Sequence, residues 1–298
     1  MEKININYHY DDDELTIAKM KEAYFNSPTA LKYCTSLEVK DEEIEPNIAK
    51  IYDFVCDIEY CKKCPGLKNC KKSNPHLVRK LIREFGHLKI QLTPCKRMLE
   101  KLSFERQFLI KDFSNEWLDT VLKNLDQTAP RKVALMKYNK FIKTNDPTWL
   151  YLNGGPNSGR SYFAASIVVD AARKGKGPIC FLNASQRIRE LVDLAFNRKN
   201  SEEFQKVIDQ YSTVPILAFD DFGNEFISDY VRDAIIIPIL NARSSLKLFT
   251  IFTSDFTLDE IKTLYSNQKG GAIKANNLYR IIKNNIGEEI NLGELSIY

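Results

Sequence analysis

One glycine-rich stretch, Thr148–Ser161 (TWLYLNGGPNSGRS), limits the possible folds more than any other part of the chain. It has the pattern of a short apolar strand over Trp149–Leu152, then a tight turn, then the start of a helix. The turn fits the phosphate-loop pattern G-x-x-x-x-G-K-[ST] at all but one position, because Arg160 stands where lysine is expected. Glycines let successive backbone N–H groups point at a polyphosphate, and the helix N-terminus adds partial positive charge. The stretch therefore predicts a phosphate loop; a glycine turn without a ligand is the alternative.

The chemistry of such a loop assigns roles to its residues. The hydroxyl of Ser161 is expected to hold Mg²⁺. Arg160 keeps the positive charge of the missing lysine in a planar fork rather than a compact ammonium, which should preserve attraction for a nucleotide better than transition-state geometry. The residues expected to surround the nucleotide are Gly154, Gly155, Pro156, Asn157, Ser158, Gly159, Arg160, Ser161 and Tyr162.

Apolar strands alternate with amphipathic helices from Trp149 onward. Strands are expected over Ile179–Leu182, Val214–Phe219 and Leu248–Thr253, and a long helix over Ser228–Ser245. This alternation predicts an α/β fold with a parallel sheet flanked by helices and with its sites at the C-terminal ends of the strands.

Carboxylates follow two of these strands, where a phosphate loop needs partners. Asp220 is expected to hold Mg²⁺ beside Ser161, and Asp221 to polarise an attacking water. Ser254 or Asp255, after the next strand, is placed to touch the γ-phosphate or the water. Two adjacent carboxylates can also simply end a strand. Their position about 60 residues after a phosphate loop favours a nucleotide site.

Composition limits the class of protein. The chain has 298 residues, 44% hydrophobic and 28% charged, as expected of a soluble protein with a real core. The net charge of +4 permits a nucleic-acid partner without arguing for one. No apolar run approaches the ~20 residues of a membrane span, and the acidic start MEKININYHYDDDEL has no export signal. We therefore expect a cytoplasmic protein with no membrane partner.

Cysteines crowd one region of the N-terminal part. An odd total of seven argues against a disulfide framework and for reduced thiols or metal. Cys61-x-x-Cys64, followed by Pro65 and Gly66, has the spacing of a structural zinc knuckle. Free thiols are the alternative. The expected zinc ligands are Cys61, Cys64, Cys70 and Cys95, with His76 and Cys56 in reserve.

The chain divides into three expected parts. Residues 1–105 form a mostly helical N-terminal domain around the zinc, 106–125 a linker, and 126–298 the phosphate-loop domain. Within the first part, the run from Leu77 is expected to form a short helix and then a strand around Gly86.

Several segments together resemble one protein family. GGPNSGRS, ILAFDDFGNE and LFTIFTSDFTLDEI are similar to the nucleotide-binding, metal-binding and sensor segments of the bacterial DnaI/DnaC-type helicase loaders of the AAA+ class. CKKCPGLKNC followed by LTPC resembles the zinc-binding, helicase-interacting domain of the DnaI branch. The order of the two domains also matches, and the resemblance is weakest over residues 1–50 and 100–145.

The resemblance implies ATP, Mg²⁺ and Zn²⁺ as cofactors. It implies the replicative hexameric helicase, single-stranded DNA and other primosome proteins as partners, with possible self-association, and delivery of the helicase onto DNA as the function. By position, Asp221 takes the place of the family's catalytic acid. Asp255 takes the place of the sensor residue, where the family usually has asparagine. Arg280 takes the place of the later of the family's two arginines. Asn276 or Asn277 lies where the earlier arginine is expected.

These departures lead to a hypothesis about activity. With Arg160, Asp255 and the missing arginine all altering one catalytic apparatus, we expect nucleotide binding with slow or absent hydrolysis. Two other functions remain open: an adaptor that uses the α/β domain as a docking scaffold, and a transposon-type ATPase regulator that binds nucleic acid.

Overall fold

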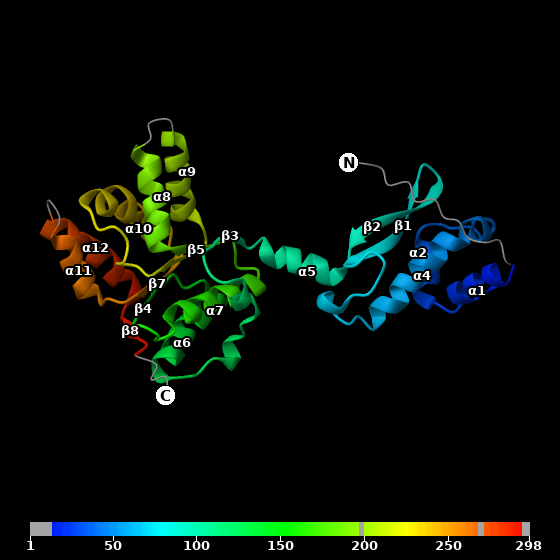
Figure 1. Cartoon of the computed structure of the whole chain (residues 1–298), viewed down its shortest axis with the longest axis horizontal. Coiled ribbons are helices and arrows are strands. Elements are labelled where there is room, and N and C mark those ends of the chain that lie inside the picture. The colour runs from blue at the N-terminus through cyan, green and yellow to red at the C-terminus, as the bar shows by residue number, and fades with distance from the viewer. Residues whose placement is uncertain (1–13, 197–199, 268–270, 294–298) are drawn as a thin grey trace. The chain divides into compact units, whose positions relative to one another are not determined.

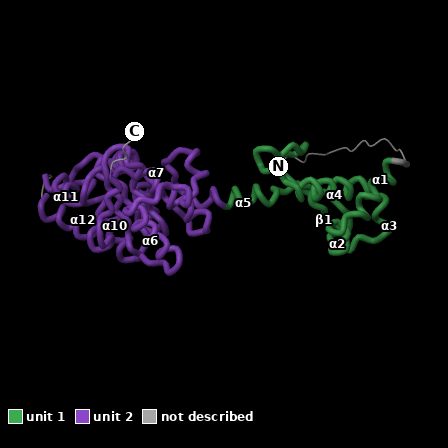
Figure 2. The backbone as a smooth tube through the Cα atoms, turned by 90° about the horizontal axis from the view of Figure 1, so that it is seen from below, with its two compact units in different colours: residues 1–103 green, residues 104–298 purple. Residues whose placement is uncertain are grey.

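The structure is a computed structural model and describes residues 14–196, 200–267 and 271–293 (Figure 1). The chain divides into two compact units, residues 1–103 and 104–298 (Figure 2). The expected helical start before residue 14 lies outside the described residues. Within the described part, no helix is both long and apolar enough to cross a membrane.

The N-terminal unit is built around four helices and one hairpin. Its own apolar core joins Met20 and Tyr24 of the first helix to Ile51 and Phe54 of the last, and Leu81 of the hairpin closes it. Helices therefore make up most of residues 14–62, in line with the expected mostly helical N-terminal part. The elements are α1 (Glu14–Phe25), α2 (Pro28–Ser36), α3 (Asp41–Ile44), α4 (Ile48–Lys62), β1 (Leu77–Glu84) and β2 (His87–Pro94), with short 3₁₀ turns at Glu45–Asn47 and Leu67–Asn69.

The hairpin corrects one expectation. The run from Leu77 forms two antiparallel strands, paired from Leu77 opposite Pro94 to Glu84 opposite His87, and not a helix followed by a strand. The turn is made by Phe85 and Gly86, both with positive φ. The apolar residues of this short run have a helix-like spacing, but the run forms a hairpin. The reason is the turn, because Gly86 readily adopts the left-handed backbone that a tight hairpin needs.

The C-terminal unit is a six-stranded sheet in which every pair is parallel. The strand order is β3-β5-β6-β7-β4-β8. Parallel strands need crossovers, and helices supply them, as the alternation in the sequence predicts. The strands are β3 (Phe108–Lys111), β4 (Leu150–Asn153), β5 (Ile179–Asn183), β6 (Ile216–Asp220), β7 (Phe249–Ser254) and β8 (Ile290–Asn291).

Helices cover both faces of this sheet (Figure 1). One core, which includes Trp149 and Tyr151, packs against α8 to α12; the other, which includes Leu150 and Leu152, packs against α6 and α7. Successive residues of β4 thus point to opposite faces, and both faces are dry. The helices are α6 (Ala129–Thr144), α7 (Arg160–Arg173), α8 (Ala184–Phe196), α9 (Ser201–Thr213), α10 (Ile237–Ser245), α11 (Leu258–Ser266) and α12 (Gly271–Ile286), and a π-helical turn over Val231–Ile236 precedes α10 within the helix expected over Ser228–Ser245.

The residues expected to form a linker, 106–125, belong to the sheet unit. Helix α5 (Lys96–Glu105) runs across the division between the units, and β3 then pairs with β5 as an edge strand. Phe113 and Trp117 pack against the core on the α6/α7 face. The sequence around these two residues is mixed and polar, so it did not indicate that they pack against a core. An edge strand and short 3₁₀ turns need only a few apolar residues each.

The strand order decides where the polar strand ends lie. β7 pairs with β6 on one side and with β4 on the other, so the C-terminal ends of β4, β7 and β6 are immediate neighbours. Asn153, Ser254 and Asp220 are the last residues of these three strands. The predicted convergence of the phosphate loop with both acidic strand ends is therefore built into the sheet.

Candidate functional site

The glycine loop joins β4 to α7 by a backbone that few other residues could follow. Gly154, Asn157 and Gly159 all have positive φ. A Cβ on Gly154 would lie 2.9 Å from the carbonyl oxygen of Gly293 and 3.0 Å from Ser158 Oγ, so a side chain there would collide. Gly159 precedes the first residue of α7, and its carbonyl accepts a hydrogen bond from the N–H of Phe163 at 2.9 Å. The local geometry is that of a loop delivering backbone N–H groups at a helix N-terminus.

The predicted magnesium corner is assembled. Asp220 Oδ1 accepts a hydrogen bond from Thr253 Oγ1 at 2.6 Å, and the hydroxyl of Ser161 lies near enough to the Asp220 carboxylate to lower its pKa. The hydroxyl on α7 and the carboxylate on β6 thus meet, with Thr253 of β7 holding the carboxylate in place. Burial raises the pKa of Asp220, while the hydroxyls of Thr253 and Ser161 partly oppose that rise. A buried carboxylate beside a serine hydroxyl is a suitable pair of oxygen donors for Mg²⁺.

Arg160 lies inside the loop that it helps to form. Its guanidinium donates to the carbonyl oxygens of Gly154 and Gly155, the latter at 2.9 Å. The same fork pairs with Asp255 and reaches Asp221 at 3.5 Å. The residue is 8% exposed, so this cluster is largely shielded from water. A guanidinium can hold two carbonyls and two carboxylates at once because its donors point outward in a fixed plane.

The two acidic positions near Arg160 are arranged by their neighbours. Asp221 has a positive φ and its backbone N–H donates to Thr253 Oγ1 at 2.9 Å. Asp255 Oδ2 accepts from the side-chain amide of Asn224 at 2.7 Å. Both carboxylates are about one-third exposed, open enough to meet a ligand. The structure therefore brings Asp221 and Asp255 together with Arg160 at the end of the sheet.

Ser254 does not take part. Its side chain is fully buried, and its hydroxyl donates to the carbonyl oxygen of Phe222 at 2.6 Å. Of the two residues considered for contact with the γ-phosphate, only Asp255 faces the loop. Ser254 is the last residue of β7, whereas Asp255 lies just beyond the strand, where its side chain reaches Arg160.

The remaining predicted site residues lie in varied settings. Pro156 and Asn157 are exposed at the tip of the loop, and Ser158 is buried with a hydroxyl that finds no partner among the described residues. Tyr162 is 37% exposed and packs edge-on against Trp117, with ring centroids 5.4 Å apart.

Arg280 is exposed on α12. Among the described residues, no hydrogen bond or ion pair joins Arg280 to the glycine loop or to Asp221, and its expected catalytic role stays a prediction.

Residues that sequence reasoning missed hold the site together. Thr253 bonds to Asp220 at the end of β6 and to Asp221 just after it. The buried Glu225 accepts from the Gly223 N–H at 2.6 Å and from the Tyr265 hydroxyl at 2.5 Å. Arg131 donates to the Ser158 carbonyl at 3.2 Å and so ties the start of α6 to the loop. Glu225 was visible in the segment DDFGNE, but nothing in the sequence indicated its distant partner.

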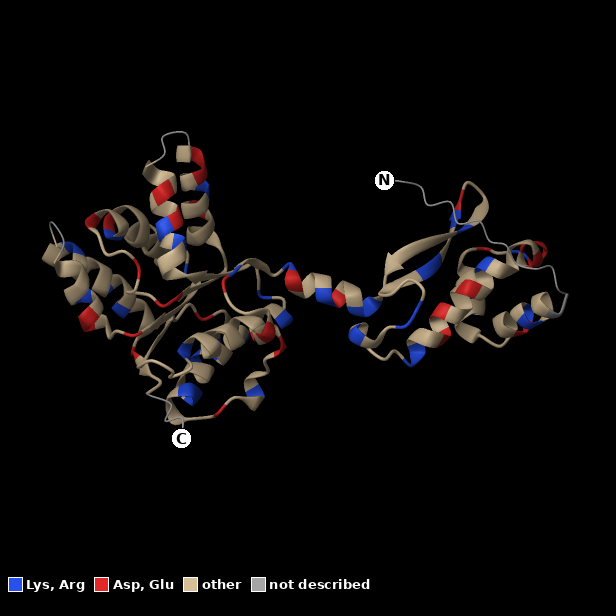
Figure 3. Ribbon diagram, viewed as in Figure 1, with Lys and Arg blue, Asp and Glu red and all other residues tan. Residues whose placement is uncertain are grey.

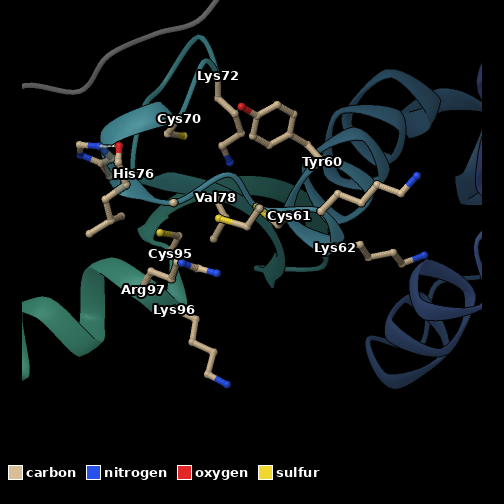
Figure 4. A pocket seen from close by; sticks show the side chains of 14 residues that line it. Tyr60, Cys61, Lys62, Cys70, Lys72, His76, Val78, Cys95, Lys96 and Arg97 are labelled. Atoms are coloured by element: carbon tan, nitrogen blue, oxygen red, sulfur yellow. Dashed lines mark hydrogen bonds between the residues drawn. The ribbon is translucent and has the colours of Figure 1, made fainter. Parts of the chain in front are cut away.

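The expected zinc ligands surround one hollow in the N-terminal unit (Figure 4). The hollow has a volume of about 530 Å³ and lies between the end of α4, the Leu67–Asn69 turn and the start of α5. The backbone N–H of Cys95 donates to the His76 carbonyl at 2.8 Å, which brings the end of β2 to the start of β1. The residues that line the hollow include Cys61, Cys64, Cys70, His76 and Cys95.

The thiols in this hollow differ in environment. Burial raises the pKa of the Cys61 thiol, whereas backbone N–H groups of His76 and Lys72 lower that of Cys70. The Nε2 atom of His76 lies 2.9 Å from the Leu67 carbonyl oxygen. In the described part of the chain, no three or more His, Cys, Asp or Glu side chains are arranged so that they could hold a metal ion. The expected zinc ligands thus line one hollow, but in the described residues their side chains are not arranged in a metal-coordination geometry.

Replacing Thr253 by valine tests how the strand ends are joined. Valine keeps the shape but removes the hydroxyl that serves both Asp220 and Asp221, so two buried polar groups lose a partner. We expect the free energy of unfolding to fall by about 1–3 kcal/mol, measured by chemical denaturation. Thr263→Val, on the exposed face of α11, is the matched control and should cost less than about 0.5 kcal/mol. Equal effects of the two changes would contradict this role.

Comparisons with known proteins agree with this picture. The replicative helicase loader DnaI of Bacillus subtilis (strain 168) is 26% identical over 244 residues, which are 78% of this chain and 76% of DnaI. A crystal structure of DnaI superposes with a TM-score of 0.55 at 24% identity, covering 62% of this chain and 97% of that one. A DnaC helicase loader structure gives a TM-score of 0.47 at 19% identity over 61% and 99% of the two chains, too low to support a statement about the fold. No protein-family model matches the chain. The chain is similar to the helicase loader DnaI over most of its length, and it has the α/β fold of DnaI.

Proposed function

We propose that this protein is an ATP-binding helicase loader, which delivers a replicative DNA helicase onto single-stranded DNA when replication starts or restarts. The observation that carries the proposal is the meeting of Ser161 and Asp220 beside a glycine loop, in a chain similar to a replicative helicase loader. The sheet unit binds the nucleotide, and the N-terminal unit binds the helicase and other primosome proteins.

The nucleotide part rests on the three strand ends. A magnesium ion between Ser161 and Asp220 would supply the charge that neutralises the β- and γ-phosphates. The loop N–H groups and the start of α7 favour the phosphates for the same electrostatic reason. In the proposed site, Asp221 and Asp255 would face the terminal phosphate and an attacking water. This arrangement supports binding of ATP more directly than it supports its hydrolysis.

Arg160 supports the view that hydrolysis is slow. Its fork is bonded to two loop carbonyls and paired with both carboxylates, so a nucleotide must replace these contacts before Asp221 can orient water. This same cluster favours the second candidate, a nucleotide-bound adaptor that does not hydrolyse ATP.

Zinc in the N-terminal unit is part of the proposal. Four thiols and one imidazole lining a single hollow have the donor chemistry of a structural zinc site, and zinc would tie α4, the Leu67–Asn69 turn and β2 together. Cys61, Cys64 and Cys95 are the assigned ligands, with Cys70 as the fourth and His76 as its alternative. The lowered pKa of Cys70 favours its thiolate, which is the form that binds metal.

Zinc content provides a direct test. We expect about one zinc ion per chain by atomic absorption, with loss of the metal and a lower melting temperature of the N-terminal unit in Cys61→Ser. Cys180→Ala, in the buried core of the sheet unit, is the matched control and should keep the metal. A metal-free native protein, or zinc retained in Cys61→Ser, would contradict the assignment.

Helicase delivery tests the function itself. Full-length protein mixed with the replicative helicase of its own host should co-elute with it, and should speed appearance of helicase activity on a closed single-stranded circle coated with binding protein. An effect of about tenfold or more over helicase alone is expected. Co-elution without any gain in delivery would favour the adaptor, and no association at all would contradict both functions.

A further inference from the structure

The cysteine end of the N-terminal unit carries a concentration of positive charge that the function described so far does not use. Residues 60–97 hold eleven Lys and Arg against one acidic residue, a net charge of +10. The rest of the chain has thirty-two basic and thirty-eight acidic residues, a net charge of −6. The modest total charge therefore hides one strongly basic segment, which Figure 3 shows as blue positions at the end of α4 and the start of α5.

Several basic residues of this unit have a carboxylate partner, and some of them lie in the same segment. Arg83 pairs with Glu43 at 2.9 Å, and Lys89 with Glu84 at 2.7 Å. Lys72 pairs with Asp57 at 3.1 Å. On most protein surfaces, charges of both signs are interspersed in this way, so no region has a large excess of one sign.

The mouth of the cysteine hollow is different. A group of exposed cations, named here the basic rim, has no ion pair with any carboxylate among the described residues. Three rim members line the hollow beside the thiols, and one of these, with a fourth, lines a second hollow that shares Gly66 and Leu67. Glu100 is the acidic residue that lines this second hollow. The basic rim consists of Lys63, Lys68, Lys71, Lys96 and Arg97.

The rim residues come from separate short elements that one ligand can reach. Lys63 follows α4, Lys68 lies in the Leu67–Asn69 turn, and Lys96 begins α5, with its side chain extended away from the thiols in Figure 4. The backbone N–H of Lys71 donates to the Tyr60 hydroxyl at 2.9 Å. Tyr60 itself lines the hollow and is half-buried, so an aromatic ring lies among the cations.

Zinc does not account for the rim. A zinc ion held by four thiolates carries a net charge of about −2. It would offset about two of the five rim cations and leave the others without a counter-charge. All five rim side chains are exposed, and four of them line one or both of the hollows.

We propose that the basic rim binds the phosphate backbone of single-stranded DNA, so that the N-terminal unit, and not only the sheet unit, contacts the strand onto which the helicase is placed. Spaced cations around an aromatic ring match the chemistry of strand binding without sequence preference, in which lysine and arginine follow the phosphates and a ring stacks on a base. The proposal deepens the proposed function by assigning its DNA contact to named residues. An acidic protein surface is the rival partner.

The salt dependence of DNA binding tests the rim. The full-length variant Lys63→Gln/Lys68→Gln/Lys96→Gln is compared with Lys19→Gln/Lys32→Gln/Lys40→Gln, which removes the same charge from exposed positions of the same unit. Affinity for a labelled oligo-thymidylate is measured by fluorescence anisotropy between roughly 50 and 200 mM salt. Each lost phosphate contact lowers the slope of log K against log salt by about 0.7, so the rim variant should lose about 2 from the slope. The control variant should keep the wild-type slope.

Two further arms keep the outcomes distinct. Lys63→Arg/Lys68→Arg/Lys96→Arg preserves charge and should retain the wild-type slope, and thermal melting and zinc content verify that every variant is folded. A rim variant with the wild-type slope overturns the proposal, even if it loses the helicase, since the rim would then serve an acidic protein surface. Wild-type protein that does not bind the oligonucleotide overturns both the rim and the DNA part of the proposed function, whereas failure of the rim alone leaves helicase delivery intact.

Discussion

The site depends on the two hydrogen bonds made by the hydroxyl of Thr253. This hydroxyl lies at the end of the middle strand, donates to the Asp220 carboxylate and accepts the N–H of Asp221. Ser161 reaches the same carboxylate from the start of α7. Three elements far apart in the sequence are thereby fixed at one edge of the sheet. The parallel strand order makes this possible, because it sets β7 between the strand of the glycine loop and the strand of the acidic pair.

Arg160 gives this site its particular character. If lysine stood at this position, its compact ammonium would bond to fewer of these carbonyls and carboxylates at once. Here the guanidinium connects the Gly155 carbonyl to Asp221 and Asp255, so the loop and its acidic partners form one cluster. An incoming triphosphate competes with the carboxylates for the same cation. Binding can therefore persist while the geometry for hydrolysis is impaired, as the departures from the family pattern suggest.

Local sequence patterns predicted the sheet and its polar strand ends, because apolar runs followed by Gly154 or by Asp220 are signals within a few residues. They did not predict contacts that depend on distant partners, such as Glu225 with Tyr265 or Arg131 with Ser158. The hairpin over Leu77–Pro94 was mistaken for a helix because a short apolar run fits both periods. The cysteines were grouped correctly around one hollow. Their spacing could not determine whether the side chains form a metal geometry.

The most direct measurement is the affinity for Mg²⁺-ATP, with single-turnover hydrolysis recorded on the same protein. Wild-type protein should bind the nucleotide, and Asp220→Asn should weaken binding by about tenfold or more, since it removes the charge that faces the metal. Hydrolysis should be slow in both. Absence of nucleotide binding would contradict the convergence of the strand ends on a triphosphate, and rapid turnover that disappears in Asp221→Asn would contradict the role given to Arg160.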